Sequence, residues 1–323
     1  MGYQMVFFDI DGTLIDEHKR IPADTLTAVK RLQETDVTVA IATGRAPDQF
    51  LHIARQFGIN SYVCCNGGYA QFNGKPVFRR PIDPQLLAAF EDMADKYHYP
   101  LVFAGSEACY ANQEDHPYVK EAFAYLDIPT LPVYDPAGWR DHEIYQVYLY
   151  CAEGEEQPFV EQFANDFRLI RPHRYYLDVF PKDVSKAGGI EAMLRELGIP
   201  QGASIAFGDG ENDVEMLSFA GLGIAMGNAS PSVQKHADYV TKRVDEGGIA
   251  DALARFGLIE YCHRIALSLF VNDRACLAGK AAPSSSELGR WQPCSRMVTY
   301  VKSCTASAQS IPPCESRLQE TCP

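Results

Sequence analysis

The chain has few basic residues and no long apolar run, and both shortages narrow its possible functions. Lys and Arg together number 29 against 42 Asp and Glu, which gives a formal net charge of −13. A chain without a basic surplus is poorly suited to neutralise a nucleic-acid backbone or to hold an anionic membrane. No apolar run approaches the roughly 20 residues that a membrane helix needs, and no signal peptide opens the chain. We therefore expect a soluble cytoplasmic protein with neither nucleic acid nor membrane as its partner.

Cysteine is scarce in most of the chain, since only four of the ten cysteines lie within the first 261 residues. These four stand in apolar, strand-like contexts, at Cys64, Cys65, Cys109 and Cys151. A free thiol in such a context behaves as a small buried hydrophobe. We therefore expect reduced, unpaired cysteines, as in a protein of the cytoplasm.

The other six cysteines lie in residues 262–322, where no apolar period is sustained. A disulfide or metal-binding module is one interpretation, but that stretch has no Cys-x-x-Cys pair, and a disulfide framework conflicts with a cytoplasmic body. Scattered serine and proline are more typical of unstructured chain. We predict that residues 260–323 form a disordered tail, whose composition would also fit non-native coding sequence.

Strand and helix patterns alternate on both sides of a middle block. The hydrophobic pattern predicts strands over residues 4–9, 37–42, 61–65, 204–207 and 222–225, and helices over residues 22–34, 46–57, 186–197, 212–219 and 248–256. Asn73-Gly74 predicts a hairpin turn, because both residues tolerate positive φ. Such alternation is typical of an α/β fold with a doubly wound, mostly parallel sheet.

The middle block has short strands rich in Tyr and Phe, and Pro129, Pro132 and Pro136 interrupt it. Short aromatic strands bounded by turns favour a separate α+β unit. We predict a discontinuous Rossmann-like core domain over residues 1–81 and 184–259, and an α+β cap domain over residues 82–183.

Two carboxylates, Asp9 and Asp11, follow the first apolar strand. Positions two apart on a strand point to the same face, so both carboxylates converge at the carboxyl edge of the sheet, where open α/β sheets bind ligands. Gly12 lets the chain turn away, and Thr13 offers a backbone N–H and a hydroxyl to an anion. A solvated or helix-capping pair is the alternative interpretation of Asp-x-Asp alone. The full run of an apolar strand into Asp-x-Asp-Gly-Thr-Leu is more specific.

Two further segments offer contacts for a phosphate. Thr43 and Gly44 end a buried strand, so the hydroxyl and nearby backbone N–H groups can bind phosphate oxygens. The alternative is that Thr43 only caps the next helix. Lys186 begins a helix after the middle block and can neutralise phosphate charge, although an exposed lysine is the usual case.

A third strand ends in Gly-Asp-Gly-Glu-Asn-Asp at residues 208–213. Asp209 and Asp213 can supply the hard oxygen ligands that Mg²⁺ prefers. Capping of the next helix is an equally open interpretation of Asp213, and we expect Glu211 to be solvated.

These segments, in this order along the chain, resemble the haloacid dehalogenase-like hydrolase superfamily, and more closely its Cof-like sugar-phosphatase branch. The resemblance runs from the first strand to about residue 259 and rests on residues 9–13, residues 43–45, Lys186 and residues 208–213. It implies that the middle block is a C2-type cap that closes over the site and contributes substrate selectivity. Residues 260–323 have no counterpart in the family pattern.

The resemblance also implies roles for individual residues. Asp9 would be the nucleophile that forms an aspartyl-phosphate, and Asp11 would be the general acid and then the general base. Mg²⁺ would be held by the Asp9 side chain, the Asp11 backbone carbonyl and Asp209, with Asp213 near the ion or bound through water. The phosphoryl group would be bound by Thr43, Gly44, Lys186 and Asn212.

The chain departs from the family pattern around Lys186, where the usual flanking glycines are replaced. Asp183 adds a carboxylate near the predicted cap boundary, so the substrate of a relative does not transfer directly. Small phosphorylated metabolites are expected, with sugar phosphates first and phosphorylated cofactors next. A phosphomutase would use the same nucleophile, and a phosphate-binding regulator is less favoured because two carboxylates beside a bound phosphate imply a metal and chemistry. We expect a monomer or a homodimer.

Overall fold

An eight-stranded sheet runs through the part of the chain that the computed structural model describes, residues 2–260. In spatial order its strands are β14 (Tyr239–Val240), β13 (Leu222–Ala225), β12 (Ser204–Gly208), β1 (Met5–Phe8), β2 (Thr38–Ala42), β3 (Tyr62–Cys64), β4 (Tyr69–Phe72) and β5 (Lys75–Arg79). The pairs from β14 to β3 are parallel, and β4 and β5 extend the sheet as an antiparallel hairpin around Asn73-Gly74. The order reverses beside β1, where a ligand site is expected.

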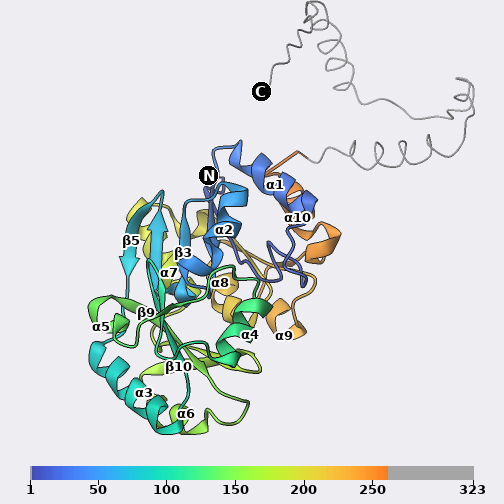
Figure 1. Cartoon of the computed structure of the whole chain (residues 1–323). Helices are drawn as coiled ribbons and strands as arrows, with labels where there is room; N and C mark the ends of the chain where they lie inside the picture. The colour runs from blue at the N-terminus through green and yellow to red at the C-terminus, as the bar shows by residue number, and fades with distance from the viewer. Residues whose placement is uncertain (1, 261–323) are drawn as a thin grey trace, which may run out of the picture. The chain divides into compact units, whose positions relative to one another are not determined.

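Helices cover both faces of this sheet (Figure 1). They are α1 (Ala23–Gln33), α2 (Pro47–Phe57), α7 (Lys186–Leu197), α8 (Val214–Phe219), α9 (Pro231–Gln234) and α10 (Gly248–Arg255). Val6 and Phe8 of β1 pack in one core with α1, α2 and α10, whereas Met5 and Phe7 pack in another with α7, α8 and α9. Alternate residues of a strand point to opposite faces, so an apolar run such as β1 feeds both cores. The doubly wound α/β fold expected from the sequence is confirmed.

The middle block forms a second sheet of six strands. In spatial order these are β10 (Phe167–His173), β11 (Tyr176–Pro181), β9 (Ile144–Tyr150), β6 (Leu101–Gly105), β7 (Cys109–Ala111) and β8 (Val133–Tyr134). All neighbours are antiparallel except β7 and β8. Its helices are α3 (Pro84–Tyr97), α4 (Pro117–Tyr125), α5 (Gly138–Asp141) and α6 (Gln157–Phe163). Phe90 of α3 and Phe159 of α6 pack on one face, the face that Figure 1 shows turned away from the eight-stranded sheet.

The element boundaries follow the sequence prediction closely, and α7 and β13 have the predicted ends. One helix differs. The segment predicted as a helix over residues 212–219 begins with a 3-10 turn, Glu211–Asp213, before α8 starts at Val214. Asp213 Oδ2 accepts the backbone N–H of Gly210 at 2.9 Å, which tightens this first turn. The predicted cap boundaries stay a prediction. Of the tail predicted over residues 260–323, only residue 260 lies within the described residues.

The chain passes between the two sheets twice, once after β5 and once after β11. The two crossings are joined by Arg80 and Asp183, with Nε–Oδ2 at 3.0 Å and Nη2–Oδ1 at 3.2 Å. The Asp183 side chain is 62% exposed, so the extra carboxylate noted in the sequence binds an arginine at the surface.

The four cysteines of the body are buried and unpaired, as expected. Within residues 2–260, no helix has both the length and the apolar character needed to span a membrane.

Candidate active site

The candidate site lies at the carboxyl ends of β1, β2 and β12. These strands are parallel neighbours with β1 in the middle, so the residues that follow them meet at one edge of the sheet. Asp9 follows β1, Thr43 follows β2 and Asp209 follows β12. The backbone N–H of Asp9 donates to Phe207 O of the neighbouring strand at 3.0 Å. This hydrogen bond fixes the backbone position of Asp9 at the end of the strand. The sheet thus brings together residues 200 positions apart.

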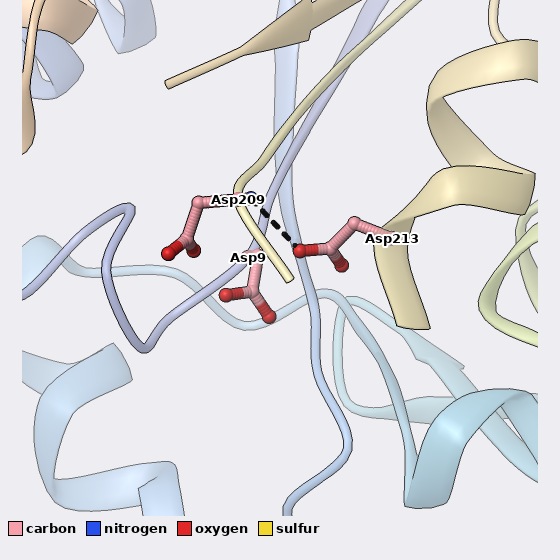
Figure 2. Close-up of side chains that lie close together, drawn as sticks. All are labelled: Asp9, Asp209 and Asp213. Carbon is pink, nitrogen blue, oxygen red and sulfur yellow. Dashed lines mark hydrogen bonds between the residues drawn. The ribbon is translucent and has the colours of Figure 1, made fainter. Parts of the chain in front are cut away.

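Three carboxylates form a cluster at this edge. Asp9, Asp209 and Asp213 each offer an oxygen within 4.8 Å of the others. Figure 2 shows the three side chains around a common space, with the Asp209 backbone N–H donating to Asp213 Oδ2 at 3.0 Å. Asp9 and Asp213 are buried, and Asp209 is partly exposed. The sequence predicted all three at one site.

Lys186 is the cation of this cluster. Its Nζ lies 2.6 Å from Asp9 Oδ1 and 2.6 Å from Asp213 Oδ1, and its side chain is 1% exposed. The alternative of an exposed helix-start lysine is therefore wrong. Burial opposes its charge, but Asp213 and Asp9 outweigh burial and raise the pKa of Lys186 above its ordinary value. A lysine is buried in a protein only when such partners compensate its charge.

The cluster still carries more negative than positive charge. Burial and then Asp213 raise the pKa of Asp9 well above its usual range, although Lys186 opposes the shift. Burial and the neighbouring Asp213 raise the pKa of Asp209 to about 7. Three carboxylates against one ammonium leave room for a divalent cation, and oxygen ligands are those that Mg²⁺ prefers. The residues present therefore fit a Mg²⁺ ion.

Asp209 is held by polar groups on both oxygens. Thr13 Oγ1 donates to Oδ1 at 3.2 Å, and Asn228 Nδ2 donates to Oδ2 at 3.0 Å. Asn228 Nδ2 also lies 2.9 Å from Gly12 O, and this asparagine was not singled out from the sequence. It lies in the run Ile-Ala-Met-Gly-Asn-Ala at residues 224–229, which also resembles the family pattern, although nothing in that run assigns the asparagine a partner.

Asp11 lies in a different electrostatic environment from Asp9. Arg45 donates from Nε to Oδ2 at 2.8 Å and from Nη2 to Oδ1 at 2.7 Å, and Lys19 Nζ lies 2.8 Å from Oδ1. Burial would raise the pKa of Asp11, but Arg45 and Lys19 outweigh burial and lower it to about 2. Arg45 Nη2 also donates to Leu126 O of the six-stranded unit at 3.1 Å. Asp11 is therefore ionised and tied, through Arg45, to the end of α4.

Thr43 and Gly44 lie beside this carboxylate pair. Thr43 is buried, and its Oγ1 accepts the backbone N–H of Arg45 at 3.1 Å. The N-cap of α2 is Ala46 and has no side-chain cap, so Thr43 does not cap that helix. A β-carbon at Gly44 would lie only 3.0 Å from Asn66 Oδ1, so the glycine permits close approach of this amide.

Asn66 connects the predicted phosphate contact Asn212 to the six-stranded sheet. Asn212 Nδ2 donates to Asn66 Oδ1 at 3.0 Å, and Asn66 Nδ2 donates to Gln146 Oε1 at 2.9 Å. Gln146 Nε2 in turn donates to Gly44 O at 3.1 Å. Asn66 has a positive φ of 52°, a conformation that asparagine tolerates better than most residues. Sequence reasoning missed this amide chain, since its members lie on three separate segments.

A cavity of about 210 Å³ opens beside Asp9 and Asp11. Both sheets contribute to its lining, which includes Lys19, Thr43, Gly44, Arg45, Gln49, Tyr125, Leu126, Tyr148, Pro172, Tyr176, Asp178, Gly210 and Asn212. Glu211 is exposed, as expected from the sequence. The arrangement combines a buried carboxylate beside a lysine, a second carboxylate held by cations, and a covered space for a small molecule.

Replacement of Gly12 by alanine is expected to displace Asp209 and to weaken metal binding by about tenfold or more. A β-carbon at Gly12 would overlap Asp209 Oδ2. Gly74→Ala is the matched control, because both glycines have a φ of 80° and nothing lies within 4 Å of a β-carbon at Gly74. Mn²⁺ titration followed by electron paramagnetic resonance would measure the affinities. Equal affinities in the two variants would contradict the proposed contact.

The chain is similar to several known proteins. The family model described as haloacid dehalogenase-like hydrolase matches residues 6–253. “Putative phosphatase YkrA” of Bacillus subtilis is 36% identical over 260 residues, which cover 80% of this chain and 100% of that protein. The solved structure of a hypothetical protein from Geobacillus kaustophilus is 45% identical, with a TM-score of 0.75 and coverage of 80% of this chain and 100% of the other. The structure of BT4131, described as a HAD subclass IIB sugar phosphatase, is 29% identical, with a TM-score of 0.70 and coverage of 79% and 100%.

Proposed function

This chain belongs to the haloacid dehalogenase-like hydrolases, and from that premise we propose that it is a Mg²⁺-dependent phosphatase of small phosphate monoesters. The observation that carries the proposal is the position of Asp9. Its carboxylate lies beside Lys186 and two further carboxylates, and it lines a cavity covered by a second sheet. A simple anion-binding site would have no use for three carboxylates at its base.

In the first step that we propose, Asp9 attacks phosphorus and the ester P–O bond breaks. The products are an aspartyl-phosphate and the departing alkoxide, which takes a proton from Asp11. Because Arg45 and Lys19 keep Asp11 ionised in the substrate-free protein, these cations must shift toward the anionic substrate before Asp11 takes up that proton. Lys186 stays beside Asp9 and offsets the charge that gathers on the phosphoryl group.

In the second step Asp11, now a carboxylate, accepts a proton from a water molecule. The water oxygen attacks phosphorus, the bond to Asp9 breaks, and inorganic phosphate and the free carboxylate are formed. The covering sheet limits access of bulk water, which strengthens the charge interactions inside.

Mg²⁺ supplies, when bound, positive charge that neutralises the phosphoryl oxygens. The residues that would hold it are the Asp9 side chain, the Asp11 backbone carbonyl and Asp209, with Asp213 beside them. Asp213 already accepts from Lys186 and from two backbone N–H groups, so it also fixes the positions of its neighbours. Phosphoryl oxygens would be contacted by Thr43, Gly44, Lys186 and Asn212.

Sugar phosphates or phosphorylated cofactors are the substrate classes that we propose, in a cytoplasmic monomer or homodimer. BT4131 is described as a sugar phosphatase, which supports the first class. The core domain would comprise residues 1–81 and 184–259, and the cap would comprise residues 82–183.

A phosphate-release screen over phosphorylated metabolites is the test. We expect Mg²⁺-dependent release from several esters, with a fall of at least about 100-fold after removal of the metal by EDTA and recovery with excess Mg²⁺. Isomerisation of sugar phosphates without phosphate release would instead support a phosphomutase. Tight binding of phosphate esters with no turnover would overturn the proposed enzymatic function and would favour a phosphate-binding regulator.

A further inference from the structure

Asp178 is a carboxylate of the cavity that the proposed chemistry does not use. It lies on β11 of the six-stranded sheet and lines the same cavity as Asp9 and Asp11. Its Oδ2 accepts from Asn66 Nδ2 at 3.3 Å. Among the residues that the structure describes, no lysine or arginine pairs with Asp178, and its Oδ1 accepts no hydrogen bond. One oxygen is therefore free to bind a molecule in the cavity.

The charges around Asp178 leave it uncompensated. Burial raises the pKa of Asp178 to about 7, opposed by the hydrogen bond from Asn66 and by Lys186. The two cations that line the cavity, Lys19 and Arg45, are bound to Asp11. The ionised form of Asp178 repels a phosphate, so it is suited to contact the other end of a phosphate ester, the leaving group, where a cation would favour that form.

Tyrosine rings line the cavity together with this carboxylate. Tyr148 and Tyr176 are buried, and their ring centroids lie 6.1 Å apart at an angle of 79°. The Tyr148 hydroxyl donates to Gln49 Oε1 at 2.9 Å, which fixes the ring. Tyr125 lines the same cavity from the end of α4. Lys19 Nζ already lies 5.1 Å from the Tyr125 ring centroid, so this ring has an ammonium beside it in the substrate-free protein. Aromatic rings beside an unpaired carboxylate are surroundings that suit an ammonium group.

We propose that Asp178 is a specificity-determining residue that binds a protonated amine on the leaving group, so that the preferred substrates are phosphate monoesters of amino alcohols or amino sugars. The inference rests on the proposed phosphatase function. An ammonium would neutralise the carboxylate, whereas a hydroxyl would donate one hydrogen bond and leave the buried charge in place. A charge-assisted hydrogen bond is also about twice as strong as a neutral one.

The test compares two series of phosphate esters on the Mg²⁺-loaded full chain. The first series is the ω-aminoalkyl phosphates with two to five carbons, and the second is the ω-hydroxyalkyl phosphates of the same lengths. We expect wild type to prefer the amine by about tenfold or more in kcat/KM at one or more lengths. Asp178→Asn is expected to reduce this preference to about twofold, because the amide has no charge to offer.

The amine-to-hydroxyl ratio is measured within each protein, so any general loss of activity in the variant cancels. Asp183→Asn is the matched control, because Asp183 is exposed, binds Arg80 and does not line the cavity, and it should keep the wild-type ratio. The wild-type ratio alone tests the proposal if Asp178→Asn does not fold.

The outcomes separate this proposal from the function on which it rests. Equal kcat/KM for amine and hydroxyl esters at every length would overturn the amine proposal while the phosphatase stands. An amine preference that survives in Asp178→Asn would overturn the role of Asp178. Failure of every ester in the wider screen to release phosphate with Mg²⁺ would overturn the phosphatase itself.

Discussion

Asp9→Asn is expected to lower kcat by at least about 10³-fold while leaving the fold intact. An amide has nearly the shape of a carboxylate but cannot form the acyl-phosphate. The substitution also removes one of three clustered buried carboxylates, so the free energy of unfolding of the metal-free protein should not fall. Phosphate release at saturating Mg²⁺ and urea unfolding would measure the two effects. Asp36→Asn, at an exposed position, is the matched control and should behave as wild type.

A lower kcat alone would not separate a nucleophile from a metal ligand. Rapid acid quenching with a ³²P-labelled ester is expected to leave a hydroxylamine-sensitive label on the peptide that contains Asp9. The label should be absent in Asp9→Asn. A variant that kept activity within about tenfold of wild type at saturating metal would show that another group attacks phosphorus.

Lys186→Met is expected to lower the free energy of unfolding by about 3–5 kcal/mol in metal-free protein. The methionine side chain fills similar space but leaves Asp9 and Asp213 buried without the ammonium that lies 2.6 Å from each. Urea unfolding with EDTA present would measure the loss. Lys235→Met, at an exposed site with no side-chain bond in the described chain, should change stability by less than about 0.5 kcal/mol.

The double variant Lys186→Met with Asp9→Asn provides a sharper test of the same charge balance. Removal of one carboxylate reduces the uncompensated charge, so the double variant should lose less stability than the sum of the two single variants. A loss below about 1 kcal/mol in Lys186→Met would show that these carboxylates are not held by the lysine charge.

Most of the fold could be predicted from the sequence because apolar residues recur with a clear strand or helix periodicity in its elements. The apolar run of β1 and the amphipathic pattern of α7 specify their elements locally. The carboxyl-edge rule then places Asp9, Thr43 and Asp209 together without any knowledge of tertiary contacts. The order of strands in the six-stranded sheet could not be derived, since antiparallel pairs of short aromatic strands fit several arrangements.

The partners of these residues were harder to predict, because they depend on approach between distant segments. Arg45 stood in the Thr-Gly-Arg run, yet nothing local shows that it would bind Asp11 rather than solvent. Asn66 is an uncharged residue in a turn, and its contacts come from three segments. Asp178 looks like an ordinary polar residue on a strand, and only the packed structure shows that it faces a cavity.

The paired crossings at Arg80 and Asp183 have a mechanical consequence for the enzyme. A body attached through one flexible strand can swivel in any direction, whereas two adjacent attachments joined by a bidentate ion pair define a single hinge line. Rotation about that line would open the hydrogen bonds from Gln146 to Gly44 and from Arg45 to Leu126, whereas sliding or twisting would also break the Arg80–Asp183 pair. The opening between the two sheets is therefore expected to vary through one hinge angle. A decrease in that angle brings the six-stranded sheet onto a molecule in the cavity from one side.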